Sequence, residues 1–573
     1  MIRIPLNGEG MGARCAAWAA AVVLVAGGCD TRTLLVAEPS DGGSDASGEV
    51  GGDGLDGVET DRTDDRGGDG GDLPPDGPSF DTDALGDEFA DEGRESGDDA
   101  TDGAGDDGAA TDAEPSCPVW VVPAATGSPE DGSAENPFVG LRRALEARGS
   151  CAHIVLRDSS PESPFEAAVE IAVAAGEILT IEGDPAEARP VELDARDGIG
   201  LSAGGGGSLV LRHLAVRNGR GPSGGCLDAL VGSLRLEDTE WTGCRADAQC
   251  SAVAVTAAAV DIVDSRFLSN EVLGDTPSSW GAIGTVCIDG PVDTAHVLVE
   301  RCRIEDNQAG EGAPLWMRAR TEDATVQDCL FLRNGAHIGA SAVEGHVGSL
   351  AHCRFADNGV MSEAPTVWLE AGPRSRVVHN VFIDNRAARG ASALELSQGL
   401  VANNLFVRNG CSDSPGSGWC LSAVWVSPRS GGGSVDLRNN TFVDNASVRG
   451  IAHLAFDSAY GAVHSNLFVG GAGTAAVGTV HPELTASAEL RYNAWWDVPE
   501  PVWGDGIRVG DGNAEADPLF AGGDDYRLGP GSAAIDAGDP DPSLSDPDGT
   551  RSDVGAFGGP EGDWIPLEEG GAP

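Results

Sequence analysis

The chain has 573 residues, with 83 glycines, 33 prolines and a formal net charge of −56. So much glycine and acid excludes one ordinary globular core over the whole length, and so negative a chain is not expected to bind nucleic acid. The composition changes near Cys117. Before it the chain is mostly Asp, Gly, Ala, Ser and Glu, and after it apolar residues return at short, regular spacing. We therefore expect two regions with different physical behaviour.

Residues 1–29 have the pattern of an export signal, in which two arginines precede an apolar stretch, 16–26, that is short for a membrane span. Met1 and Met11 are both candidate start residues. The stretch ends in LVAGGC, which resembles a bacterial lipobox and makes Cys29 the predicted lipidation site. This interpretation predicts an exported protein that is lipid-anchored at the outer membrane or cell surface. The alternative is an ordinary cleaved signal and a secreted product.

Residues 30–115 consist of Asp/Gly-rich stretches such as DRTDDRGGDGGD. A segment of this composition buries too little apolar surface to offset its ordering entropy, and its like charges repel. We predict a disordered acidic linker that holds the following region away from the membrane.

Residues 116–515 contain an internal repeat. Segments such as HNVFIDN, NNLFVRN and DCLFLRN share a template in which a small polar residue is followed two positions later by a large apolar residue, and then by Asn three positions further on. Apart from two longer steps, the small polar position recurs every 24 to 27 residues. It is occupied by His213, Thr239, Ser265, Cys302, Cys329, Cys353, Asn380, Asn404, Asn440, Asn466 and Asn493.

The large apolar position begins at Ala215 and Trp241, continues mainly as Phe and ends at Trp495. A strand of period two places these residues on one inward face. The Asn of the template, from Asn218 to Asn445, recurs where the strand must bend, and there we expect left-handed backbone and a ladder of hydrogen-bonded Asn side chains. A repeat near 25 residues with short strands and no helical pattern predicts an all-β parallel β-helix.

In these features residues 117–560 resemble the right-handed parallel β-helix proteins of the pectate-lyase-like superfamily. Upstream, ENPFVGLRRALEARG predicts a short amphipathic helix with Asn136 as N-cap and Pro137 as its first residue, similar to the helix that caps the N-terminal end of such solenoids. Downstream, residues 516–573 resemble the closing segment of exported bacterial β-helix proteins, so a C-terminal capping segment is expected.

Of the 13 cysteines, Cys15 and Cys29 belong to the export signal, which leaves an odd number. Export permits disulfides. The predicted pairs are Cys411 with Cys420, in one inserted loop, Cys117 with Cys151, and Cys226 with Cys250. Cys302, Cys329 and Cys353 hold the position that Asn fills in later repeats, so we expect small buried residues there.

A second strand follows each Asn bend, and aligning these strands gives two outward columns. The first contains Trp316, Glu344, Trp368, Glu395 and Trp425, and the second begins with Arg318, His346 and Glu370. Neighbouring coils lie ~4.8 Å apart, so tryptophans on every second coil recur at ~9.6 Å, close to a disaccharide repeat. Trp faces stack well on sugar rings, and exposed Trp is costly in water. We therefore predict that Trp316, Trp368 and Trp425 bind a polysaccharide or another surface polymer.

Two alternatives stay open for these columns. The chain is a structural or adhesive rod if the tryptophans are only covered by another part of it, for which the segment with Trp495, Trp496 and Trp503 is the candidate. We expect a monomer in either case.

The chain is an enzyme, a polysaccharide lyase or a glycoside hydrolase, if the acidic residues of the columns perform chemistry. The candidates are Glu344, Glu370 and Glu395, with Arg318 and His346 as the only basic pair. The only candidate cofactor is calcium, with Asp546, Asp548 and Asp553 as ligands; an acidic turn is the competing interpretation.

Overall fold

The structure is a computed structural model that describes residues 117–124, 129–157, 163–273, 284–290, 296–318, 321–359, 364–411, 419–427, 433–481 and 487–570. The predicted export signal, the lipidation site Cys29 and the acidic linker lie outside these residues. Within the described part of the chain, no helix is long and apolar enough to cross a membrane.

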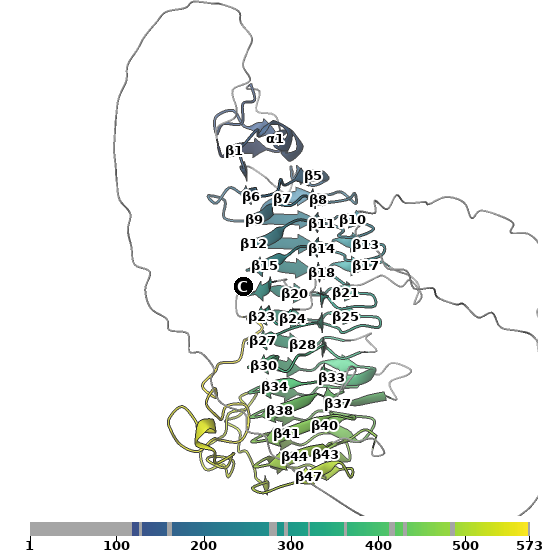
Figure 1. Cartoon of the computed structure of the whole chain (residues 1–573), viewed down its shortest axis with the longest axis vertical. Coiled ribbons are helices and arrows are strands. Elements are labelled where there is room, and N and C mark those ends of the chain that lie inside the picture. Colours follow the sequence, from purple (N-terminus) through teal and green to yellow (C-terminus); the bar gives the residue numbers. More distant parts are fainter. Residues whose placement is uncertain are drawn as a thin grey trace, which may run out of the picture. The chain divides into compact units, whose positions relative to one another are not determined.

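The described residues form a parallel β-solenoid, as the repeat predicts, and its strands stack as an elongated column from β1 to β47 in Figure 1. Most coils add one strand to each of three rows. The first row is β1 (Val119–Val122), β3 (His153–Leu156), β6 (Ile178–Gly183), β9 (Ser208–Arg217), β12 (Ser233–Thr242), β15 (Ala259–Val263), β19 (His296–Glu300), β23 (Ala324–Gln327), β27 (Ser349–Ala351), β30 (Arg376–Val378), β34 (Gly399–Ala402), β38 (Ser434–Arg438), β41 (Tyr460–His464), β44 (Ser487–Arg491) and β47 (Ile507–Val509).

The second row begins beside β1 and continues through the second halves of the long strands β9 and β12. Its own strands are β2 (Phe138–Val139), β4 (Phe165–Glu166), β7 (Val191–Asp194), β16 (Arg266–Leu268), β20 (Arg303–Glu305), β24 (Leu330–Leu332), β28 (Arg354–Ala356), β31 (Val381–Ile383), β35 (Leu405–Val407), β39 (Thr441–Val443), β42 (Leu467–Val469), β45 (Ala494–Trp496) and β48 (Ala514–Glu515).

The third row is a separate 13-stranded sheet. Its strands are β5 (Val169–Ala172), β8 (Leu201–Gly204), β11 (Leu227–Leu230), β14 (Val253–Thr256), β18 (Val286–Asp289), β22 (Leu315–Met317), β26 (Val343–Gly345), β29 (Val367–Leu369), β33 (Arg389–Leu396), β37 (Trp419–Val426), β40 (Ile451–Phe456), β43 (Ala475–Thr479) and β46 (Val502–Trp503). Two small sheets lie between the second and third rows: β10 (Arg220–Gly221), β13 (Arg245–Ala246), β17 (Glu271–Val272), β21 (Gln308–Ala309) and β25 (Gly335–Ala336), and then β32 (Arg386–Ala387) and β36 (Gly410–Cys411).

The core is the inward column of large apolar residues in the second row. From Phe331 to Phe468 the Phe rings of successive coils stack with centroids 4.7 to 5.0 Å apart, which is the spacing of neighbouring strands. The first coil of this column differs from the prediction by one residue. Val216 rather than Ala215 pairs with Trp241, and Leu214 rather than His213 pairs with Thr239, because His213 adopts left-handed backbone and turns the chain.

Two Asn ladders follow the turns. In each ladder the side-chain amide of one Asn donates to Oδ1 of the next Asn at 2.9 to 3.1 Å. One ladder contains Asn270, Asn307, Asn334, Asn358, Asn385, Asn409 and Asn445, and the other contains Asn380, Asn404, Asn440, Asn466, Asn493 and Asn513. In the first of these ladders the left-handed residue is the one before the Asn, such as Asp306 or Asp384, so the Asn serves the ladder and its neighbour makes the turn.

The single α-helix of the described residues, α1 (Leu141–Ala147), packs against β1, β2 and β5 and buries Leu141 and Ala144. Its N-cap is Gly140, so the predicted start at Asn136 and Pro137 is wrong. The reason is that Phe138–Val139 pairs with β1 as strand β2, and sheet pairing replaces the first helical turn.

Four disulfides join the described cysteines. They pair Cys117 with Cys151, Cys226 with Cys244, Cys250 with Cys287, and Cys411 with Cys420. The predicted Cys226–Cys250 pair is wrong, because Cys226 pairs with Cys244 and Cys250 pairs with Cys287. Cys302, Cys329 and Cys353 are free and buried in the ladder position, as expected.

The C-terminal segment, residues 516–570, contains one 3-10 turn, η1 (Pro542–Leu544), and lies along the side of the later coils (Figure 1). It covers the outward side of the second-row strands from β24 to β45, which we call the covered face. There Trp564 is 5 % exposed in one apolar cluster with Leu330, Ile383 and Leu405. The amide of Asn403 donates to the carbonyls of Ala556 and Gly558 at 3.0 and 2.8 Å.

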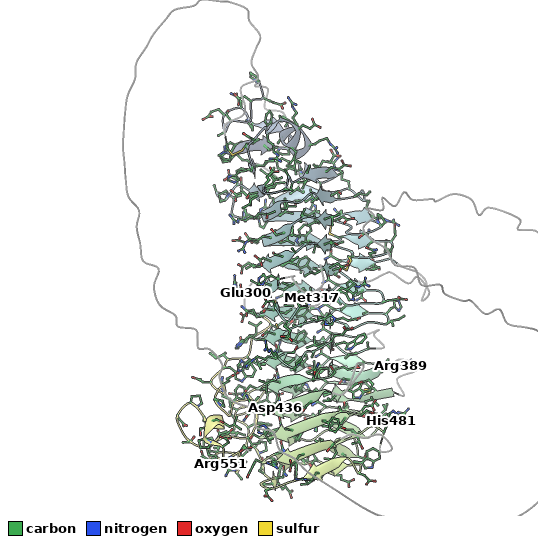
Figure 2. All side chains as sticks on the ribbon, in the orientation of Figure 1. Glu300, Met317, Arg389, Asp436, His481 and Arg551 are labelled. Carbon is green, nitrogen blue, oxygen red and sulfur yellow. A yellow bond between two sulfur atoms is a disulfide. The ribbon has the colours of Figure 1, made fainter. Side chains whose placement is uncertain are left out.

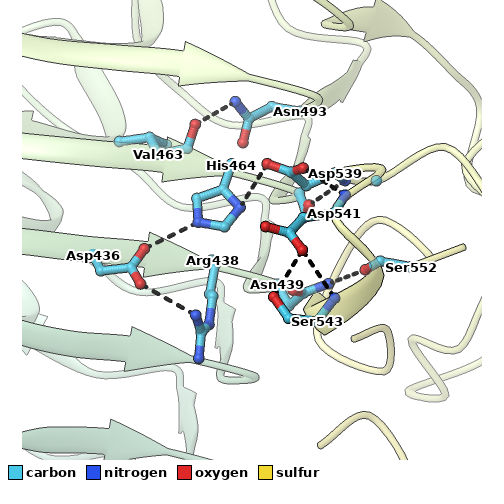
Figure 3. A network of polar contacts seen from close by, with 12 residues as sticks. Asp436, Arg438, Asn439, Val463, His464, Asn493, Asp539, Asp541, Ser543 and Ser552 are labelled. Atoms are coloured by element: carbon cyan, nitrogen blue, oxygen red, sulfur yellow. Dashed lines mark hydrogen bonds and ion pairs between the residues drawn. The ribbon is translucent and has the colours of Figure 1, made fainter. Parts of the chain in front are cut away.

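A polar network continues this interface toward the end of the solenoid (Figure 3). His464 lies between Asp436, at 3.1 Å, and Asp539, at 3.7 Å. Asn439 donates to Ser552 Oγ at 3.1 Å. The segment is thus held by both apolar burial and hydrogen bonds, along a side of the solenoid.

Candidate functional site

The third row places the predicted outward residues in one column, which we call the Trp column. Consecutive Cα partners run from Trp316 through Glu344, Trp368 and Glu395 to Trp425. In β22, β29, β33 and β37 the residues before and after them point inward and are buried, as Val343 is in β26, where Gly345 is half-buried. The column therefore follows directly from strand alternation.

The members of the Trp column are not equally accessible. The three tryptophans are partly exposed, whereas Glu395 is only 1 % exposed, which differs from the prediction that the whole column faces solvent. The cause lies in β33, which is longer than the preceding strand β29 and has irregular register with β37. Gly390 has left-handed backbone there, and a Cβ at this glycine would lie 3.4 Å from Glu395 Oε2 and 3.5 Å from the Trp425 ring. The chain thus folds over this carboxylate.

A cavity of about 420 Å³ opens above the first part of the column. It is lined by Trp316, Glu344 and Trp368, by Arg318, His346 and Glu370 of the second column, and by Asp289, Gly290, Met317 and Gly345. We call it the first cavity.

Most charges of the first cavity are engaged within it. His346 Nε2 lies 2.6 Å from Glu370 Oε2. The guanidinium carbon of Arg318 lies 6.0 Å from the centroid of the Trp316 ring. Glu344 accepts a hydrogen bond of 3.0 Å from the backbone N–H of Ala340.

Two further cavities adjoin the first. A cavity of about 300 Å³ shares His346 and Glu370 with it and is otherwise lined mainly by turn residues such as Glu322 and Gln398. Another, of about 560 Å³, shares Trp368 with it, and we call it the second cavity. Its remaining lining includes Ile338, Pro365, Arg389, Glu395, Leu421 and Trp425. Figure 2 labels Met317 of the first cavity and Arg389 of the second. The three cavities are neighbours on one face of the solenoid, which we call the groove, and they span several coils.

The sequence did not single out Arg389, Glu311 and Asp289, which line this groove. Asp289 ends strand β18 one coil before Arg318, so extending the second column by one coil would have found it. Arg389 begins β33 and Glu311 lies between β21 and β22, so both precede the strand positions that the repeat aligns.

The candidate catalytic residues fall into two places. Glu344, Glu370, Arg318 and His346 line the first cavity, and Glu395 lies buried beside the second. The contact of His346 with Glu370 engages the only imidazole of the first cavity. The arrangement suits stacking of sugar rings on Trp316 and Trp368, with carboxylate acceptors for sugar hydroxyl groups between them.

The candidate calcium ligands lie in the C-terminal segment, where Asp546, Asp548 and Asp553 line a cavity of about 660 Å³. Each accepts backbone N–H groups. Asp546 accepts from Asp553 at 3.0 Å, Asp548 from Thr550 at 2.9 Å, and Asp553 from Asp536 at 2.7 Å. Burial is the main cause that raises the pKa of Asp546 to about 6. Among the residues that the structure describes, no three acidic, His or Cys side chains are arranged to hold a metal ion.

The candidate cover of the Trp column is wrong. Trp503 stands in the same outward column beyond Ala455 and Gly478 and is 43 % exposed, while Trp496 on β45 is 37 % exposed. Residues 516–570 lie on the covered face. None of the residues 487–570 lines the first or second cavity.

No protein-family model matches the chain, and no curated protein matches it. The class is therefore defined by the fold itself: this is an all-β parallel β-solenoid protein with an aromatic and acidic groove on one of its sheets.

Proposed function

We propose that this protein is an exported, lipid-anchored surface protein whose solenoid binds an uncharged saccharide in the first cavity. One observation carries the proposal. Trp316 and Trp368, on alternate coils, line one cavity with Glu344 between them.

The chemistry of these side chains suits sugar rings. Indole faces stack on the apolar faces of pyranoses and lose unfavourable exposure when they do so. Carboxylates accept hydrogen bonds from hydroxyl groups. Two tryptophans separated by two coils, ~9.6 Å, match a disaccharide unit.

The charge of the site and of the chain favours an uncharged ligand. Asp289, Glu344 and Glu370 line the first cavity together with Arg318 and His346, and the whole chain carries −56. An anionic polysaccharide would be repelled by this field unless cations bridge it.

A glycan array on the purified protein, with and without calcium, tests the proposal. We expect binding to uncharged saccharides that is lost in Trp316→Ala and Trp368→Ala and retained in Trp503→Ala, a matched control in the same column outside the cavities. Absence of saccharide binding by the folded wild-type protein would favour the structural rod instead.

The anchor is a separate part of the proposal and rests on the LVAGGC motif that ends at Cys29. We expect the wild-type protein to incorporate labelled fatty acid and to sediment with membranes, and Cys29→Ser to lose both properties. Secretion of the wild-type protein without lipid would show that the signal is an ordinary cleaved one.

A further inference from the structure

We infer that the second cavity is a second saccharide subsite, so that the ligand is an extended, linear, uncharged polysaccharide rather than a single sugar or a disaccharide. This inference rests on the proposed function and specifies its ligand class.

The two cavities are neighbours, because Trp368 lines both of them. The side chain of Trp368 therefore borders both spaces, so a polymer that occupies the first cavity reaches the edge of the second. From Trp316 to Trp425 the column crosses four coil steps, or ~19 Å. That path runs along the solenoid axis and is too long for a disaccharide.

The lining of the second cavity suits the apolar faces of sugars. Ile338, Pro365 and Leu421 line it beside Trp368 and Trp425. The indole nitrogen of Trp425 is buried and has no hydrogen-bond partner among the described residues. What this side chain offers to a ligand is therefore ring surface, which provides stacking rather than a hydrogen bond.

The charges of the second cavity select against an ionic polymer. Glu311 and Glu395 oppose the single Arg389, and Glu395 is buried. A carboxylated or sulfated sugar would place further negative charge beside two carboxylates. An uncharged sugar can hydrogen-bond to Glu311 and Arg389, whereas the Glu395 carboxylate is buried.

The part of the chain that covers the other face does not fill the second cavity, which leaves it open to the polymer. Residues 516–570 dock elsewhere, and none of them lines the second cavity. The proposed ligand of the first cavity already ends at Trp368, so continuation of the same polymer is the simplest way to fill the adjoining space.

Calorimetric titration with uncharged linear oligosaccharides of two lengths tests the inference. The probes are the disaccharides and hexasaccharides of the cello, xylo, manno and chito series, with hexagalacturonate as a charged comparison. In at least one uncharged series we expect the hexasaccharide to bind ~10-fold more tightly than the disaccharide, as additional contacts require. We expect hexagalacturonate not to bind.

The variants separate this inference from the proposed function. Trp425→Ala should lower the affinity for the hexasaccharide to that for the disaccharide and leave disaccharide binding unchanged. Trp425→Phe should retain most of the length dependence, and Trp503→Ala all of it. Thermal unfolding checks that each variant is folded.

Two results would overturn the inference. If Trp316→Ala abolishes binding but folded Trp425→Ala keeps full affinity for the hexasaccharide, the first subsite stands and the second falls. If no uncharged oligosaccharide of either length binds the folded wild-type protein, the inference and the proposed function fall together.

Discussion

Two sides of the same solenoid carry large apolar side chains on their outer surface. The C-terminal segment covers one of these sides and not the other. On the covered face, outward residues such as Leu330, Ile383 and Leu405 are buried under the C-terminal segment with Trp564. On the third row, Trp316 and Trp368 line a cavity that no residue of that segment reaches.

Outward apolar side chains can thus be buried by the chain itself, or they can be left accessible to a ligand. The solenoid already has a continuous core inside its coils, so neither outer face needs apolar residues for coil stability. Large outward apolar groups are therefore expected only where something contacts them. On the covered face the chain itself is that partner, and on the Trp column we propose a saccharide.

The largest expected effect comes from removing the contact that defines the covered face. Trp564→Ala empties an indole site that is 5 % exposed, and we expect a loss of ~3 to 5 kcal/mol from the free energy of unfolding or of segment docking. Denaturant unfolding, together with proteolysis of residues 516–570, measures it. Trp496→Ala, at an exposed site, is the control. Impaired saccharide binding in Trp564→Ala would contradict the separation of the two faces.

A buried histidine in the core predicts how the stability of the solenoid depends on pH. His453 on β40 is buried, with Nδ1 3.1 Å from the Asn445 amide and Nε2 3.1 Å from Gly470 O, and burial lowers its pKa from 6.5 to about 4. The unfolded chain therefore binds a proton at a pH where the folded chain does not. The contribution of neutral His453 to the free energy of unfolding is complete above pH 6.5. It is lost as the pH falls toward 4, by ~3 kcal/mol in all.

Urea unfolding at pH 7.5 and pH 4.5 measures this dependence. His453→Gln keeps an amide at the site and removes the titration, so its stability should change less between the two pH values. An equal change in the variant and the wild type would show that other groups govern the acid sensitivity.

On the Trp column the expected effect is on binding and not on folding. Trp316→Ala removes one stacking surface from the first cavity, and we expect the affinity for an uncharged saccharide to fall by roughly 30-fold, or about 2 kcal/mol. The midpoint of thermal unfolding should change little, because this side chain is partly exposed. A large loss of stability without a loss of affinity would make this column structural, like the covered face.

The smallest effect is expected from the acid between the tryptophans. Glu344→Gln keeps an acceptor and removes one charge, so saccharide affinity should fall by about 1 kcal/mol or less. The same variant tests catalysis: if the bound saccharide is cleaved, turnover should vanish in Glu344→Gln, Glu370→Gln or Glu395→Gln. Unchanged turnover in all three would exclude these carboxylates as catalytic groups.

Part of the site was predictable from the sequence. The Trp column could be predicted, because alternation along short strands and a repeat of 24 to 27 residues together assign each side chain to a column. The covered face also has a signal in the sequence. Strands β24, β31 and β35 read LFL, VFI and LFV, apolar on both sides, whereas β20 reads RIE.

The sequence by itself determined the coil: its period, its Phe column, its Asn ladders and the outward order of Trp and Glu. These features are local or repeat once per coil, so each needs only the neighbouring coil. Only the tertiary structure decided which face residues 516–570 cover, that Cys226 pairs with Cys244, and that Glu395 is buried. The physical reason is that these outcomes depend on how irregular segments fold back over the coils, through contacts such as Asn403 with Ala556 that lie 153 residues apart and follow no period.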